Sequence, residues 1–135
     1  VNFARHDKFM WGFAYGNGWG QNIAGLSGSG ADAVINPNGS LTVFPALNFF
    51  AGVEHYWLSN LASTLAIAGG GLQSPANRSA DAQEIAATYH LNLRWAVIKK
   101  FIVGVEYMGG MQRVADGREG FAQRIQLAAR YNFTN

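Results

Sequence analysis

The sequence predicts an all-β fold, a portion of an antiparallel transmembrane β-barrel with about six strands. Three observations predict it. Apolar and polar residues alternate with period two over segments long enough to cross a bilayer as tilted strands, which takes roughly 9 to 11 residues. Charged residues make up only 13% of the 135 residues, about half the usual share in soluble domains. No run of apolar residues is long enough for a membrane-spanning helix.

The first expected strand runs from Lys8 to Tyr15, after an extended tail at Val1 to Phe3 and a polar turn at Ala4 to Asp7. Its odd-numbered positions are all aromatic, whereas its even-numbered positions are basic, small or flexible. A stretch rich in Gly, Ser, Asn and Asp then extends to Ser40 and predicts a long loop. That loop leaves room for one helical turn around Gln21 to Leu26.

The remaining strands alternate in the same way and are separated by turn-forming residues. The second strand is expected at Phe44 to Trp57, with Pro45 near its start, where a proline suits a strand end. The third strand ends in consecutive glycines, and the last one alternates most clearly of all. The four later strands are expected at Leu61 to Leu72, Ile85 to Val97, Phe101 to Arg113 and Phe121 to Phe133.

Long and short connections alternate along the chain, as in transmembrane barrels with short periplasmic turns and long extracellular loops. The short turns are expected at Leu58 to Asn60 and Ile98 to Lys100. The long loops are expected at 16–40, 73–81 and 114–120. If the short turns are periplasmic, the last strand runs inward and ends at the periplasmic side.

The charges predict which face of each strand meets lipid. If the last strand were turned over, Arg124 and Arg130 would face the bilayer, and one arginine costs about 2 to 4 kcal/mol at its midplane. The apolar face is therefore expected outside. The aromatic girdle candidates on it are Trp11, Trp57, Trp95, Phe101, Tyr131 and Phe133. The pore-lining candidates on the opposite face are Lys8, Glu54, His90, Arg94, Glu106, Arg124 and Arg130.

The pore-lining candidates carry more positive than negative charge, which favours a basic wall that attracts anionic solutes. The alternative is that these groups pair across the wall and only make it rigid, for example Glu106 with Arg130 on the next strand. The sequence leaves both interpretations open.

Several function classes have little support in the sequence. The chain has no cysteine, and its histidines, His6, His55 and His90, show no metal-ligand spacing, so we expect no metal and no cofactor. The formal charge of +2 is spread along the chain, which does not favour nucleic acid. His90 with Ser63 or Thr64 does not form a spacing that predicts hydrolysis, so we expect no enzyme.

Seven short segments in order resemble outer-membrane porins of Gram-negative bacteria, and among them the DcaP-like trimeric porins. They are DKF (7–9), YGNGWG (15–20), AGVEHYW (51–57), LASTL (61–65), VGVEYMGG (103–110), DGREG (116–120) and RIQLAARYNF (124–133). The last segment also resembles the signal read by the outer-membrane assembly machinery, with apolar alternation that closes on Phe133. Thr134 and Asn135 follow it, which departs from the usual terminal aromatic residue.

The resemblance implies a homotrimeric channel in the outer membrane, in contact with lipid, through which small hydrophilic solutes, with anions as candidates, diffuse passively. It also implies more strands than six, because porin barrels have about 16 to 18. The chain is then expected to be the C-terminal portion of a larger barrel, as one segment over residues 1–135, or one of several chains that assemble a barrel. Two alternatives stay open: a soluble β-barrel or sandwich that binds a ligand, and a structural barrel that does not conduct.

Overall fold

The computed structural model describes residues 7–23, 25–26, 30, 32–73 and 78–133. Their strands and one short 3₁₀ helix follow in this order: β1 (Lys8–Asn17), η1 (Gly20–Asn22), β2 (Ala33–Ile35), β3 (Leu41–Val43), β4 (Pro45–Leu58), β5 (Leu61–Leu72), β6 (Gln83–Ile98), β7 (Phe101–Val114) and β8 (Glu119–Tyr131). Six long strands form one antiparallel sheet. The expectation of an all-β chain with about six antiparallel strands is therefore confirmed.

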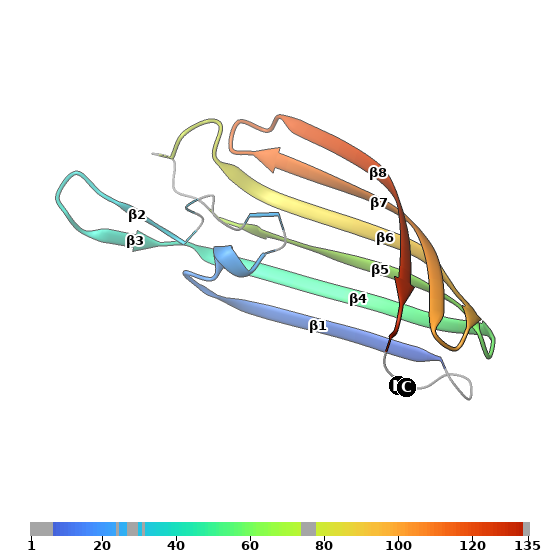
Figure 1. Cartoon of the computed structure of the whole chain (residues 1–135). Coiled ribbons are helices and arrows are strands. Elements are labelled where there is room, and N and C mark those ends of the chain that lie inside the picture. Colours follow the sequence, from blue (N-terminus) through green and yellow to red (C-terminus); the bar gives the residue numbers. More distant parts are fainter. Residues whose placement is uncertain (1–6, 24, 27–29, 31, 74–77, 134–135) are drawn as a thin grey trace.

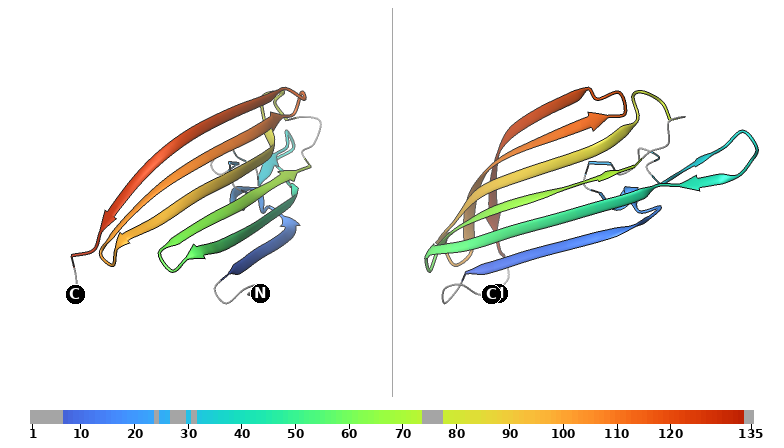
Figure 2. Two further views of the ribbon diagram at one scale, coloured as in Figure 1. Left: turned by 90° about the vertical axis from the view of Figure 1, so that its right-hand side faces the viewer. Right: turned by 180° about the vertical axis from the view of Figure 1, so that it is seen from behind.

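The six long strands lie in the order β1-β4-β5-β6-β7-β8, and every neighbouring pair is antiparallel. Figure 1 shows them side by side, and Figure 2 shows that the sheet is twisted and curved. Such twist follows from the chirality of L-residues. Within the described residues β1 and β8 are the two edges and do not pair with each other. Closure into a barrel is therefore not part of the observed fold.

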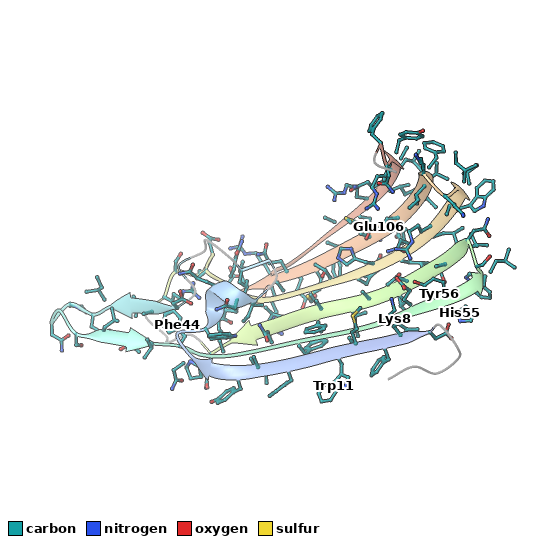
Figure 3. All side chains as sticks on the ribbon, turned by 60° about the horizontal axis from the view of Figure 1, so that its bottom comes forward. Lys8, Trp11, Phe44, His55, Tyr56 and Glu106 are labelled. Atoms are coloured by element: carbon teal, nitrogen blue, oxygen red, sulfur yellow. The ribbon has the colours of Figure 1, made fainter. Side chains whose placement is uncertain are left out.

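The register divides the side chains into two faces, because paired residues share a face. We call one the inner face, and one row of it comprises Lys8, Glu54, Thr64, Asn92, Glu106 and Gln126. We call the opposite one the outer face, and one row of it comprises Trp11, Ala51, Ile67, Tyr89, Gly109 and Gln123. In Figure 3 the sheet curves with Lys8, Tyr56 and Glu106 inside the curve and Trp11 outside it.

The expectation of one long loop up to Ser40 was wrong, since β2 lies within this stretch and pairs with β3 directly after it. Two short β-branched segments flank the sequence NPNGS, and Gly39 has a φ of +80°, a conformation that favours glycine in a turn. Asn38 Oδ1 accepts a hydrogen bond from the Ser40 amide at 3.0 Å. In Figure 1 the hairpin projects beyond the sheet next to the start of β4.

Several expected boundaries shift by a few residues. β1 continues to Asn17, β6 begins at Gln83, and β8 spans Glu119–Tyr131 and leaves Phe133 outside the strand. Phe44 precedes β4 and is 1% exposed. The expected helical turn at 21–26 is a 3₁₀ helix at Gly20–Asn22, and residue 24 lies outside the described residues. The expectations for residues 1–6, including His6, and for Thr134 and Asn135 also lie outside them.

The short turns consist of Ser59 and Asn60 after β4, and of Lys99 and Lys100 after β6. We call the end of the sheet that carries them the short-turn end, and the opposite end the long-loop end. No helix in the described part of the chain is long and apolar enough to cross a lipid bilayer.

Candidate functional site

The inner face holds all seven residues predicted to line a pore. Lys8, Glu54 and Glu106 belong to the row defined above, and the register places His90 opposite Met108 and Arg94 opposite Gly104. Arg124 and Arg130 lie on the same face of β8, opposite Met108 and Ile102 respectively. Five of the six long strands therefore place on one surface side chains that are far apart in the sequence.

A continuous polar row crosses the inner face with one residue from each long strand. Its members are Lys8, Glu54, Thr64, Asn92, Glu106 and Gln126. On the long-loop side of this row, small residues such as Gly110 and Ala122 alternate on β7 and β8 with the larger Met108, Gln112 and Arg124.

Glu54 joins two cations on different strands. Its Oε1 lies 3.5 Å from Lys8 Nζ, and its Oε2 lies 3.4 Å from Arg94 Nη2. The Glu54 side chain is 16% exposed, whereas the two cations are about half exposed. Lys8 Nζ also lies 5.9 Å from the centroid of the Tyr56 ring. This cluster neutralises part of the basic charge on β1 and β6.

Glu106 pairs with His90 and not with Arg130, which corrects the pairing offered as an example from the sequence. Glu106 Oε1 lies 2.8 Å from His90 Nδ1 on the neighbouring strand. Within the described residues, neither an ion pair nor a hydrogen bond engages the guanidinium groups of Arg124 and Arg130. The unneutralised cations of the inner face therefore lie together on β8.

A cavity of about 350 Å³ opens over the inner face of β6, β7 and β8 near the short-turn end. Its polar inner-face lining comprises Thr64, Asn92, Arg94, Glu106, Gln126 and Arg130. The cavity therefore brings guanidinium, carboxylate, amide and hydroxyl groups into one space.

The segment around η1, by which we mean η1 itself with Ile23, Gly25 and Leu26, folds over the inner face at the long-loop end. Asn48 Nδ2 donates to the Asn22 carbonyl at 3.0 Å, and Gln112 Nε2 donates to the Gly25 carbonyl at 3.3 Å. The buried apolar cluster there comprises Ile23, Leu26, Phe44, Ala46, Leu72 and Ala86. Burial of this cluster and the two hydrogen bonds hold the segment against the wall.

A second cavity of about 510 Å³ remains beside the folded segment, bounded by Gly25 on one side and by the inner faces of β6, β7 and β8 on the other. Gly110 and Ala122 line this cavity, and because both residues are small they leave its space unfilled. The segment therefore covers part of the inner face at the long-loop end, whereas the residues of β8 stay exposed.

The outer face is apolar and exposed on every long strand. Trp11 is 67% exposed, Phe121 75% and Leu127 78%. Of the girdle candidates, Trp57, Trp95, Phe101 and Tyr131 lie at the short-turn end, whereas Trp11 lies level with Tyr89, away from that end. Phe133 lies beyond β8, with its ring centroid 4.9 Å from that of Tyr131.

Polar groups on the outer face bond to one another. Trp57 Nε1 donates to Ser63 Oγ at 3.0 Å, and Tyr89 Oη lies 3.3 Å from Tyr107 Oη. His55 Nδ1 lies 2.8 Å from the carboxylate of Asp7. Such pairing lowers the cost of placing these groups in an apolar environment.

Two loops at the long-loop end are joined by Arg118, which forms ion pairs with Asp81 and Asp116. The amide of Ala115 donates to the Ala82 carbonyl at 2.9 Å, so the backbone contributes to the same contact. The hydrogen bonds from the Arg118 amide and guanidinium lower the pKa of Asp116. The pKa of Arg118 is raised, first by its bond to Asp81.

Comparison of the chain with protein-family models, with curated proteins and with solved structures finds no match. The resemblance to outer-membrane porins thus stays a prediction from the sequence. What the inner and outer faces can do is argued below from their geometry alone.

Sequence reasoning missed the residues that connect distant strands. Asp7, placed in a turn, binds the His55 side chain and also accepts a hydrogen bond from the Tyr56 amide at 3.1 Å. The sequence also did not identify Asn48 and Gln112, which hold the segment around η1. No spacing signal identifies such contacts, because each joins residues more than twenty positions apart. Among the described His, Asp and Glu side chains no cluster of three could hold a metal ion.

Proposed function

We propose that this chain forms part of the wall of a transmembrane β-barrel in a Gram-negative outer membrane, through which small hydrophilic solutes, with anions as candidates, diffuse passively. One observation carries the proposal, namely the separation of charge between the two faces. The inner face bears Lys8, Glu54, Arg94, Arg124 and Arg130, whereas the long central part of the outer face bears no charge.

The height of the uncharged band fits a bilayer. On β7 the outer-face residues from Phe101 to Met111 are all uncharged, and Arg113 follows opposite Glu119. At roughly 3.3 Å per residue this band is about 33 Å long along the strand. A strand tilt of roughly 40° reduces it to about 25 Å, the height of the apolar band on outer-membrane barrels. With the sheet turned over, each inner-face arginine would cost about 2 to 4 kcal/mol near the midplane.

The unpaired edges also favour closure. β1 and β8 expose backbone amide and carbonyl groups that an apolar environment cannot satisfy, so further strands must pair with them inside a membrane. A barrel made by additional strands, assembled as a homotrimer and recognised by the outer-membrane assembly machinery through β8, meets this requirement. The inner face would then line the lumen, and wall charge and width would select the solute.

Two measurements test this proposal. The purified assembly that closes the barrel around this chain is expected to require detergent or lipid for monodisperse behaviour, and to produce stepwise conductance in planar bilayers. Monodisperse protein in plain buffer would favour the soluble binding barrel instead, and detergent dependence without conductance would favour the structural barrel. A cation-selective channel whose selectivity does not change in Arg124→Gln/Arg130→Gln would contradict the basic wall.

Fluorescence quenching tests the orientation of the faces. In single-tryptophan variants, lipids brominated along the acyl chain are expected to quench Trp11, which lies exposed on the outer face. Trp19, which follows β1 at the long-loop end, serves as the matched control and is expected to be quenched less. Equal quenching of both residues would contradict the assignment of the outer face to lipid.

A further inference from the structure

We propose that the cavity over β6, β7 and β8 binds a small zwitterion, of the size of an α-amino acid. The inference rests on the proposed channel in that it places the site in the path of the solute. The cavity, of about 350 Å³, has a cationic part at Arg94 and Arg130 and an anionic part at Glu106. These are the two charges that a zwitterion requires at separate positions.

The cationic part suits a carboxylate. Arg130 has no bonded partner among the described residues, so its guanidinium can meet a solute without losing an existing contact. Arg94 contacts Glu54 through Nη2 at 3.4 Å, and a guanidinium has further N–H donors. Guanidinium groups bind carboxylates in a planar, often bidentate geometry.

The anionic part suits an ammonium group. Glu106 uses Oε1 for His90, and a carboxylate has about four lone-pair sites, so it can accept a second donor. Asn92 and Gln126 lie directly opposite Glu106 on the two neighbouring strands. Their amides can accept from the remaining ammonium protons or donate to the solute carboxylate.

The spacing fits a short solute. Arg94 lies opposite Gly104, two positions from Glu106 on β7. Two residues along a strand and one strand across place the Cα atoms of Arg94 and Glu106 about 8 Å apart. At this separation both side chains can turn toward one solute, so a solute with one carbon between its ammonium and its carboxylate can contact a guanidinium nitrogen and a Glu106 oxygen together, with a hydrogen bond of about 2.9 Å at each end.

The mixed charge also excludes other solutes. A dicarboxylate would place its second carboxylate near Glu106, and a diamine would place an ammonium near the arginines. Each contact between like charges is unfavourable and leaves a polar group of the wall without a partner. A zwitterion is therefore preferred over both.

Binding is tested on the whole chain in detergent micelles by saturation-transfer NMR, with glycine as the probe and glycolate as the analogue that lacks the ammonium group. Glycine is expected to bind more tightly than glycolate. Arg130→Gln and Glu106→Gln are each expected to weaken glycine binding about tenfold, the effect of one charged hydrogen bond. Arg113→Gln, which removes the same charge from the outer face of β7 outside the cavity, is the matched control and is expected to bind glycine normally.

The outcomes separate this inference from the proposed channel. Glycolate binding as tight as glycine binding, or normal glycine binding in Glu106→Gln, overturns the zwitterion site. Liposome swelling is measured in parallel with glycine and with glycolamide, a neutral solute of similar size. Permeation of glycolamide without binding of glycine leaves the channel and overturns the site, whereas glycine binding without any permeation overturns the channel and leaves the site.

Discussion

Glu54 of β4 and Arg94 of β6 contact each other across β5, with 3.4 Å between Oε2 and Nη2, although their strands are not neighbours. The contact is possible because the inner-face residues of β5 between them, Ala62 and Thr64, are short. Lys8 approaches the same carboxylate from β1. One carboxylate therefore neutralises charge contributed by two other strands, and leaves the cations of β8 unpaired.

Glu54→Gln is expected to increase anion preference in planar bilayers, because it removes the negative charge between Lys8 and Arg94. We expect the anion-to-cation permeability ratio, measured as a reversal potential in a salt gradient, to rise roughly twofold. Glu119→Gln removes the same charge at the far end of the outer face and is expected to change the ratio less. An unchanged ratio in Glu54→Gln would show that this cluster does not face the conducting path.

Asn48→Ala combined with Gln112→Ala is expected to release the segment around η1 from the wall. The two lost hydrogen bonds are worth about 2 kcal/mol together, which makes the detached state roughly 30-fold more populated. Single-channel conductance is then expected to rise or to fluctuate between two levels. Asn36→Ala, which disturbs only the bonds to Ser40 and Thr42 in the projecting hairpin, is the control. If both variants had the same conductance, the segment around η1 would not narrow the lumen.

Gly70→Ala is expected to destabilise the sheet. A Cβ at Gly70 would lie against the Leu47 carbonyl oxygen and 2.9 Å from Asn48 Cα, and backbone atoms cannot move aside cheaply. We expect a loss of about 1 to 3 kcal/mol in the free energy of unfolding, measured by denaturant titration in detergent. Gly120→Ala, where no atom lies within 4 Å of the new Cβ, is expected to have little effect. Equal stability of the two variants would show that β4 and β5 are packed less closely.

Arg118→Gln is expected to loosen the contact between the two loops at the long-loop end and to speed their cleavage in limited proteolysis. The pH dependence follows from Asp116, whose folded-state pKa is held below the ordinary Asp value by hydrogen bonds from Arg118. A lowered pKa means that this contact is complete above the ordinary Asp pKa and is lost as the pH falls through the folded-state value. Cleavage in the parent chain should therefore rise only in strong acid. Arg124→Gln, on β8 but away from these loops, should keep the parent's cleavage rate.

The six long strands were predictable because each repeats one pattern over its full length. The last strand, from Phe121 on, alternates so regularly that its two faces follow from the sequence, and the register confirms that Arg124 and Arg130 share one of them. The hairpin of β2 and β3 was missed because each of its strands has only three residues, too few for a period to be recognised.

By itself, the sequence determined which side chains share a face of the sheet, since the side-chain period of a strand is two and a slip in register would expose arginines with apolar residues. Only the tertiary structure decided which charges meet. Glu106 pairs with His90 and not with Arg130, and Glu54 contacts Arg94 across the short side chains of β5. Such contacts depend on the register of the strands and on the size of the residues between them. The segment around η1 likewise lies on the inner face through contacts with residues of distant strands.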